Sequence, residues 1–381
     1  LLVGAPQADI SELEGLVKTL GYEIARSVIL SRMEQNPVYG FGKGKAEEIA
    51  ALSKELECAL IIFDFEISPR KQRNWEKLAK IPVIDRQEVI LRIFASRAQT
   101  KEAVLQVQLA QLEYARPRLA HSYGDMARQR GGNFGAKGSG ETQLELDTRK
   151  IREKIPQLKK ELEQVVRDRE TQRKRREKIP LPTCALAGYT NAGKSTLLNR
   201  LTDAGVLAEN KLFATLDLTS RAIELPDGRS VTLIDTVGLI RRLPHHLVEA
   251  FRSTLEEAAS ADIILHVSDI SDPEAKEKTL TTQKLLAELG CGEIPVVNIL
   301  NKSDLVEYDI PEDDTTVKIS AKTGAGIDRM LGCIRFLRFL DRADFDVRTQ
   351  DADDVISFIE GTLKHRQGER IDGFPLRGTP L

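Results

Sequence analysis

Short hydrophobic runs alternate with amphipathic stretches over residues 1–95. The runs are typical of buried strands, and the stretches between them are typical of helices. The expected strands are Leu1–Val3, Ile24–Ser31, Leu60–Asp64 and Pro82–Ile84, and the expected helices are Asp9–Leu20, Lys45–Glu57 and Pro69–Lys80. Because strands that alternate with helices form parallel sheets, we expect a small parallel α/β domain over residues 1–95.

Over residues 96–179 the hydrophobic pattern becomes that of two long helices, on either side of a glycine-rich loop at 131–140. Aliphatic residues recur three and four positions apart in both stretches: Leu105, Leu109 and Leu112, then Ile151, Ile155, Leu158, Leu162 and Val165. Two such seams joined by a loop predict an antiparallel helical hairpin. Pro156 lies in the second seam and is expected to kink that helix or to mark its start.

Alternation of strands and helices returns over residues 180–340. The expected strands are Thr183–Ala187, Ala222–Leu225, Ser230–Ile234, Ile263–Ser268, Val296–Leu300 and Thr316–Ile319. A tight turn at Pro226–Arg229 makes the second and third of these strands an antiparallel hairpin. We therefore predict an α/β protein whose second α/β domain has a mixed, mostly parallel sheet, followed by a short C-terminal region of unknown role at 341–381.

Composition and charge narrow the possible locations and partners. No apolar run reaches the roughly 18 residues of a membrane helix. The four cysteines are far apart, without disulfide or metal spacing, and no secretory signal is visible, so we expect a cytoplasmic protein. Because the chain opens at Leu1 rather than Met, an upstream piece can be missing. Residues 149–178 carry 13 basic and 6 acidic side chains, which suits either a polyanion partner or a solvated helix.

The segment GYTNAGKS, from Gly188 to Ser195, matches the P-loop pattern between a strand and a helix. Its backbone N–H groups and the helix N-terminus would point at phosphates. Lys194 is expected to reach the β- and γ-phosphates, and the Ser195 hydroxyl to bind Mg²⁺. The nucleotide-binding residues expected here are Gly188, Asn191, Ala192, Gly193, Lys194, Ser195 and Thr196.

Asp235-Thr-Val-Gly238 ends the third strand of this domain and completes the expected phosphate and metal site. Asp235 would hold Mg²⁺ through water, and the Gly238 N–H would bind the γ-phosphate. We favour Thr215 over Thr190 and Thr219 as the residue that covers the metal when GTP is bound. The expected metal ligands are thus Ser195, Thr215 and Asp235, and the expected catalytic residues are Lys194, Thr215 and Gly238.

Two further motifs select the base. Asn301-Lys302-Ser-Asp304 follows the fifth strand, and its carboxylate would accept hydrogen bonds from the guanine N1–H and 2-amino group, which adenine lacks. The backbone of Ser320-Ala321-Lys322 would contact the base oxygen. Four motifs in this order predict a GTP and Mg²⁺ site.

The sequence does not identify the residue that would activate the attacking water molecule. Leu239 stands where many GTPases carry glutamine, so we expect slow turnover alone, completed by a partner, by another residue or by a potassium ion at Asn191. Arg241 and Arg242 are interpreted as exposed residues that bind phosphate or a partner.

Two glycine-rich segments lie outside this domain. The loop from Arg130 to Gly140 would bring its backbone close to RNA, although a loop of no function has the same composition. Its candidate RNA-binding residues are Arg130, Gly131, Gly132, Gly135, Lys137, Gly138 and Gly140. Gly42-Lys-Gly-Lys45 would cradle phosphate as an RNA or ATP site, or would form a plain strand-to-helix turn.

These motifs together resemble the HflX family of ribosome-associated GTPases over nearly the whole chain. The resemblance rests on GYTNAGKS, LFATLD at 212–217, Asp235–Gly238 and, most specifically, RGGNFGAKGSGETQLELDTRK at 130–150. It implies a GTPase that binds the large ribosomal subunit and its RNA, splits stalled or hibernating ribosomes under stress, and in some members unwinds RNA with ATP. We separately expect the protein to be a monomer. The alternatives are a potassium-dependent GTPase of RNA modification, an ATP-driven RNA unwinding factor and a slow adaptor for a protein partner.

Overall fold

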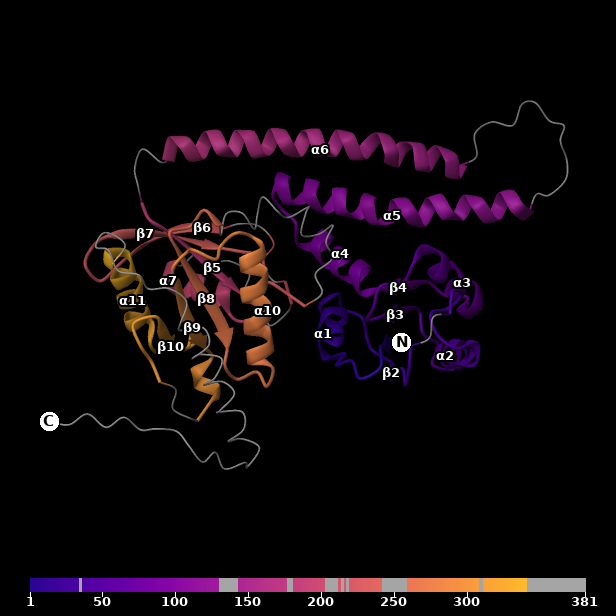
Figure 1. Cartoon of the computed structure of the whole chain (residues 1–381), viewed down its shortest axis with the longest axis horizontal. Helices are drawn as coiled ribbons and strands as arrows, with labels where there is room; N and C mark the ends of the chain where they lie inside the picture. Colours follow the sequence, from indigo (N-terminus) through magenta and orange to yellow (C-terminus); the bar gives the residue numbers. More distant parts are fainter. Residues whose placement is uncertain are drawn as a thin grey trace. The chain divides into compact units, whose positions relative to one another are not determined.

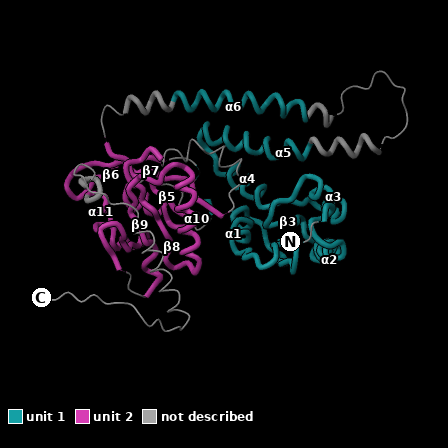
Figure 2. The backbone as a smooth tube through the Cα atoms, viewed as in Figure 1, with its two compact units in different colours: residues 1–180, 209–217, 242–253 teal, residues 181–208, 218–241, 254–381 magenta. Residues whose placement is uncertain are grey.

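A computed structural model describes most of the chain. The described residues are 1–33, 36–129, 143–176, 181–202, 212–213, 216, 219–241, 259–307 and 311–340. They belong to two compact units, one made of residues 1–180, 209–217 and 242–253 and the other of residues 181–208, 218–241 and 254–381 (Figure 2). The glycine-rich loop at 131–140, Thr215, Arg242 and the C-terminal region at 341–381 lie outside the described residues.

The first unit contains a four-stranded parallel sheet (Figure 1). Its strands are β1 (Leu2–Gly4), β2 (Ser27–Ile29), β3 (Ile61–Phe63) and β4 (Val83–Asp85), in the order β2-β1-β3-β4. The prediction of a parallel α/β fold is confirmed. The strand predicted at Ile24–Ser31 is only three residues long, and its side chains are intermediate or exposed rather than buried.

Four helices connect or follow these strands: α1 (Ser11–Thr19), α2 (Lys43–Glu55), α3 (Pro69–Ala79) and α4 (Arg86–Arg97). Ser68 starts α3 by accepting a hydrogen bond from the Lys71 N–H, with Pro69 in the first turn. The sequence analysis did not predict α4, which Asp85 starts by accepting a hydrogen bond from the Glu88 N–H at 3.1 Å. The core of this unit is aromatic, with Phe41, Phe63 and Trp75 in contact.

Two long helices complete the first unit as a hairpin. They are α5 (Lys101–Gln129) and α6 (Gln143–Arg176), which run side by side (Figure 1). The predicted seam is confirmed, because Leu105, Leu109, Ile155 and Leu158 form one buried cluster. Since α6 begins at Gln143, Pro156 lies inside the helix and does not mark its start.

A buried polar cluster fastens α5 to the sheet of the first unit. Asp85 is fully buried and accepts hydrogen bonds from Tyr114 Oη at 3.0 Å and Arg118 Nη2 at 3.1 Å, both on α5. The Arg118 guanidinium stacks on the Tyr114 ring at 3.3 Å. Burial, and next the Asp85 charge, raise the pKa of Tyr114, so its hydroxyl stays protonated and donates.

The second unit contains a six-stranded sheet in the order β10-β9-β8-β5-β7-β6. Its strands are β5 (Thr183–Gly188), β6 (Thr219–Glu224), β7 (Ser230–Asp235), β8 (Ile263–Asp269), β9 (Val296–Asn301) and β10 (Thr316–Lys318). Only β6 is antiparallel to its neighbour, which confirms the predicted mixed, mostly parallel sheet. The carboxyl ends of the parallel strands therefore share one edge, where α/β sheets bind ligands.

Helices bury both faces of this sheet. The helices α7 (Lys194–Thr202) and α11 (Ile327–Leu340) place Leu197, Leu198, Met330 and Ile334 in the larger apolar cluster. The helix α10 (Ala275–Glu288) contributes Leu286 to the smaller one. No helix among the described residues combines the length and apolar character that a membrane crossing needs.

The buried Asp85 carboxylate predicts a large stability difference in the first unit. We expect Asp85→Asn to lower the free energy of unfolding by about 3 kcal/mol, because it leaves the Arg118 charge buried without its counter-ion. Urea unfolding followed by fluorescence of Trp75, the single tryptophan and fully buried in this unit, measures the change. Glu47→Gln, which breaks an exposed pair with Lys43, is the control and should cost less than about 0.5 kcal/mol. Equal effects of the two substitutions would contradict the prediction.

Candidate functional site

The P-loop connects the end of β5 to the start of α7 in the second unit. Lys194 is only 6% exposed, and its Nζ donates hydrogen bonds to the carbonyl oxygens of Gly188 at 3.0 Å and Tyr189 at 3.1 Å. Burial lowers the pKa of Lys194 to about 8, against the opposing attraction of Asp235. The Lys194 ammonium group is thus held at the P-loop, where the negative charge of a bound phosphate would pair with it.

Two glycines at the site have no room for a side chain. A Cβ at Gly193, where φ is +96°, would lie 2.2 Å from Asn301 Nδ2. A Cβ at Gly238 would lie 2.9 Å from Thr190 Cα and 3.3 Å from Lys194 Nζ. The backbone of each glycine therefore makes an approach that any other residue would block, which leaves its N–H group close to the position expected for phosphate.

The oxygen atoms that would hold Mg²⁺ lie together. Ser195 Oγ donates a hydrogen bond to Asp235 Oδ2 at 3.0 Å, and Asp235 at the end of β7 is fully buried. A hydroxyl and a carboxylate are the hard ligands that Mg²⁺ prefers, with water and phosphate oxygens for the remaining positions. Within the described ranges no group of three His, Cys, Asp or Glu residues could bind a metal ion.

The loop after β7 is joined to the P-loop by main-chain hydrogen bonds. The Thr190 N–H donates to the Leu239 carbonyl at 2.7 Å, and the Leu239 N–H donates to the Gly188 carbonyl at 3.1 Å. The Leu239 side chain is 3% exposed. It points into the protein and cannot orient an attacking water molecule.

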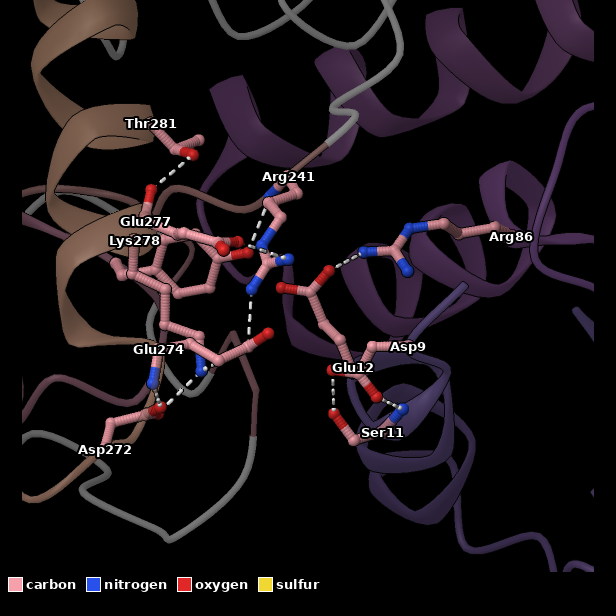
Figure 3. A network of polar contacts seen from close by, with 11 residues as sticks. Asp9, Ser11, Glu12, Arg86, Arg241, Asp272, Glu274, Glu277, Lys278 and Thr281 are labelled. Atoms are coloured by element: carbon pink, nitrogen blue, oxygen red, sulfur yellow. Dashed lines mark hydrogen bonds and ion pairs between the residues drawn. The ribbon is translucent and has the colours of Figure 1, made fainter. Parts of the chain in front are cut away.

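Arg241 extends this connection toward α10 (Figure 3). Its N–H donates to Tyr189 Oη at 2.8 Å, and its guanidinium pairs with Glu274 and, at 3.3 Å, with Glu277. Lys278 pairs with Glu274 at 3.4 Å. Arg241 is half-buried rather than exposed as predicted, because carboxylates of α10 hold its side chain, and its role in binding phosphate or a partner stays a prediction.

The predicted base-binding motifs meet at the ends of β9 and β10. Asn301 Nδ2 donates to the Ala192 carbonyl at 2.8 Å, and the Ala321 N–H donates to Asn301 Oδ1 at 2.9 Å. Ser320 Oγ donates to Asp304 Oδ1 at 2.6 Å. This bond leaves the exposed Asp304 carboxylate oriented for a base. Lys302 Nζ pairs with Asp269 Oδ2 at 2.6 Å.

The predicted site residues that the structure describes converge on one sheet edge, and Thr215 falls outside them. Two residues beside Thr215 belong to the first unit: the Phe213 ring packs edge-on against Phe94 at 4.7 Å, and the Leu212 N–H donates to Thr19 Oγ1 at 3.3 Å. Leu212 and Phe213, which precede Thr215 in the sequence, are thus held by residues of the first unit.

Sequence analysis missed two residues of this site, Tyr189 and Arg200. Tyr189 is a variable position of the P-loop pattern, and its role depends on Arg241, 52 residues later. Arg200 on α7 donates from Nε to the Ala321 carbonyl at 3.2 Å and from Nη2 to the Lys322 carbonyl. No local signal marks either contact.

Comparison with known families matches three successive segments of the chain. Residues 7–95 match a family model described as GTP-binding GTPase N-terminal, and residues 97–176 match one described as GTP-binding GTPase Middle Region. Residues 183–302 match a model described as 50S ribosome-binding GTPase.

Individual relatives match across these segments. The chain is 48% identical over 332 residues to GTPase HflX of Lacrimispora saccharolytica, covering 86% of this chain and 78% of the relative. It is 44% identical over 329 residues to GTPase HflX of Escherichia coli K12, covering 84% and 77%. Among solved structures, a GTP-binding protein from Sulfolobus solfataricus in complex with GDP is 23% identical, covers 88% of this chain and 97% of that chain, and has a TM-score of 0.46.

The Asp304 carboxylate predicts which base the site selects. We expect Asp304→Asn to weaken GDP binding by on the order of 100-fold, because the amide N–H₂ of asparagine opposes the 2-amino group of guanine. The same variant should bind xanthosine diphosphate more tightly than the wild type does, since xanthine carries an acceptor there. Competition titrations against a fluorescent nucleotide measure both. Asp227→Asn, in the β6–β7 turn, is the control, and a variant that still prefers GDP would exclude Asp304 from base recognition.

Buried His266 predicts a pH dependence of stability. Its Nδ1 lies 3.3 Å from Asn298 Oδ1, and burial lowers its pKa to about 4, with the Lys194 charge acting in the same direction. Below pH 6.5 the unfolded chain takes up a proton at this residue and the folded chain does not. We therefore expect the free energy of unfolding to fall by about 2 kcal/mol between pH 7 and pH 5 from this residue.

Urea unfolding followed by circular dichroism at pH 7 and pH 5 measures this dependence. His266→Gln removes the titrating group and should make the loss between the two pH values smaller by that amount. A variant with the same pH dependence as the wild type would show that His266 takes up its proton in the folded state.

Proposed function

Because this chain belongs to the HflX family of GTPases, we propose that it binds the large ribosomal subunit as a monomer and promotes splitting of stalled or hibernating ribosomes under stress. The chain is a P-loop GTP hydrolase, and the family is ribosome-associated. The observation that carries the proposal is that the GTPase domain, whose family model is described as 50S ribosome-binding, follows a middle region folded as a long helical hairpin.

The hairpin supplies the RNA-binding surface in this proposal. Exposed basic residues of α6, such as Arg149 and Arg167, belong to a segment with 13 basic and 6 acidic side chains over residues 149–178. Lysines and arginines that neutralise phosphates release counterions, so binding should weaken steeply with salt. The residues proposed to approach ribosomal RNA lie between α5 and α6 in the sequence: Arg130, Gly131, Gly132, Gly135, Lys137, Gly138 and Gly140.

The nucleotide would control this binding through two loops. Gly238 is packed against Lys194 and is the donor proposed for the γ-phosphate. Thr215 is proposed to complete the Mg²⁺ ligands with Ser195 and Asp235. GTP would order both loops and hydrolysis would release them.

The described part of the active site has no glutamine at the usual position to orient water, so catalysis needs a contribution from a partner, another residue or an ion. Leu239 is buried at the position of the usual glutamine. We propose that the ribosome supplies the missing catalytic contribution, either directly or by opening the Arg241 contacts with α10.

A potassium-dependent GTPase of RNA modification is the first alternative. Asn191 is exposed with φ at +64°, at the edge of the P-loop where an ion would bind. The chemistry of such enzymes needs a reactive cysteine. Cys184, Cys291 and Cys333 are buried, and burial raises the pKa of the Cys291 and Cys333 thiols, while Cys58 is half-buried against the apolar core of the first unit. These observations disfavour the alternative.

ATP-driven RNA unwinding by the first unit is the second alternative. The segment proposed for ATP is the start of α2, where Gly42 and Gly44 would let phosphate approach. Lys45 Nζ pairs with Glu48 at 2.6 Å, and Lys43 Nζ pairs with Glu47 at 3.6 Å. Both pairs are exposed and contribute little, so they do not decide between a phosphate site and a plain strand-to-helix turn.

We expect large ribosomal subunits to raise the rate of GTP hydrolysis by at least about tenfold, because they complete the site that Leu239 leaves unfinished. Phosphate release by the purified chain with and without subunits, in potassium and in sodium buffer, measures this. The double variant Gly131→Val, Gly132→Val should keep the basal rate and lose the stimulation and the splitting of 70S particles.

Gly292→Val is the matched control, since a Cβ at Gly292 meets no atom within 4 Å. Stimulation by potassium alone, with no effect of subunits, would replace the proposal with the modification enzyme. Normal ribosome splitting by the double glycine variant would show that the loop does not contact the ribosome as proposed.

A further inference from the structure

Arg200 joins the P-loop helix to the loop that recognises the base. It lies near the end of α7, the helix that begins at Lys194, and its guanidinium binds two successive carbonyl oxygens. These are the carbonyls of Ala321, at 3.2 Å from Nε, and of Lys322, bound by Nη2. The planar fork of an arginine suits two neighbouring acceptors, which the single ammonium of a lysine cannot bind in the same way.

Arg200 closes a ring of contacts around the nucleotide site. Asn301 binds the Ala192 carbonyl of the P-loop and the N–H of Ala321, at 2.8 and 2.9 Å. Arg200 binds the carbonyl of the same Ala321. Ala321 is thus held at both its N–H and its carbonyl, and both contacts lead back to the P-loop.

The contact with Ala321 sets the direction of the next N–H. In a planar trans peptide the carbonyl and the following N–H point in opposite directions. Because Arg200 fixes the Ala321 carbonyl, it fixes the Lys322 N–H to point away from the guanidinium. A carbonyl that accepts a hydrogen bond from a charged donor also polarises its peptide, which strengthens that N–H as a donor.

The contact with Lys322 acts on the next peptide and through it on Asp304. The Lys322 carbonyl belongs to the same peptide as the Thr323 N–H, which donates to Ser320 Oγ at 3.1 Å. Ser320 Oγ in turn donates to Asp304 Oδ1 at 2.6 Å. Two further hydrogen bonds therefore separate Arg200 from the Asp304 carboxylate, so loss of Arg200 should disturb the neighbouring Lys322 N–H much more than Asp304.

We propose that Arg200 is a positioning residue for guanine specificity, which holds the Lys322 N–H toward the 6-oxo group of the base. This inference rests on the guanine-nucleotide site and is independent of any ribosomal role. It predicts that Arg200 contributes to recognition of the oxygen at position 6 more than to recognition of the 2-amino group, which Asp304 binds directly.

The test compares three nucleotides on the full chain. GDP carries both groups, 6-thio-GDP replaces the 6-oxo oxygen with a weakly accepting sulfur, and IDP lacks the 2-amino group. We expect Arg200→Met, which keeps the apolar stem, to weaken GDP and IDP binding by about tenfold and to change 6-thio-GDP binding by less than about threefold. The preference for GDP over 6-thio-GDP should therefore shrink, while the preference for GDP over IDP stays.

Arg221→Met is the matched control, because Arg221 also donates to a backbone carbonyl, that of Ser220, on the exposed face of β6. Arg200→Lys is the second variant, kept for the case in which Arg200→Met does not fold, and should show the same selective loss. Circular dichroism checks the fold of each variant.

Equal weakening of all three nucleotides, or no weakening, would reduce Arg200 to a structural brace and overturn the proposal. A wild-type chain that does not distinguish GDP from 6-thio-GDP would also overturn it. Failure of ribosomal subunits to stimulate hydrolysis would refute the ribosomal function and leave these binding ratios unaffected.

Discussion

The carboxamide of Asn301 is the contact on which the nucleotide site depends. It is 2% exposed, donates to the Ala192 carbonyl and accepts from the Ala321 N–H, so it joins loops that follow β5, β9 and β10. The same carboxamide explains Gly193, since a Cβ there would lie 2.2 Å from Asn301 Nδ2. A buried amide that loses either partner would carry the full cost of desolvation, so these loops keep their spacing before any nucleotide arrives.

The conformation of the loop after β7 follows from a second set of main-chain contacts. The bridge between Leu239 and the P-loop holds Gly238 beside Lys194, already close to the place of a γ-phosphate. Arg241 follows in the same loop and pairs with the carboxylates of Glu274 and Glu277 on α10. A movement of Gly238 in response to phosphate would therefore strain contacts with α10, and a partner that binds α10 would act on Gly238 by the same route.

The local pattern of hydrophobic residues was sufficient to predict the strands, whereas it could not predict the contacts between loops. Apolar runs such as Ile263–Ser268 identify buried strands, and the four GTPase motifs identify the edge of the sheet that binds the nucleotide. Both kinds of signal are short, since each run or motif spans only a few residues of the sequence. The helix α4 was missed although Asp85 followed by Glu88 before an apolar run is a sequence signal for a helix start, which the capping contact of Asp85 confirms. Arg200 could not be assigned, because its partner Ala321 is 121 residues away and the contact exists only once the sheet has formed.

The two units use the same sheet edge for different purposes. In the second unit the carboxyl ends of the strands carry the nucleotide motifs. In the first unit the corresponding residues, Asp64 and Asp85, are buried and bind Arg86 at 2.9 Å and Arg118 at 3.1 Å. Burying these ion pairs carries a desolvation penalty, so stability alone does not explain them. They also fix the positions of the helices that carry the two arginines. Arg118 belongs to the middle of α5, so its pair with Asp85 fixes that helix of the hairpin to the sheet. Force on the hairpin would then be transmitted to the whole N-terminal α/β fold, instead of being lost in bending at a flexible joint.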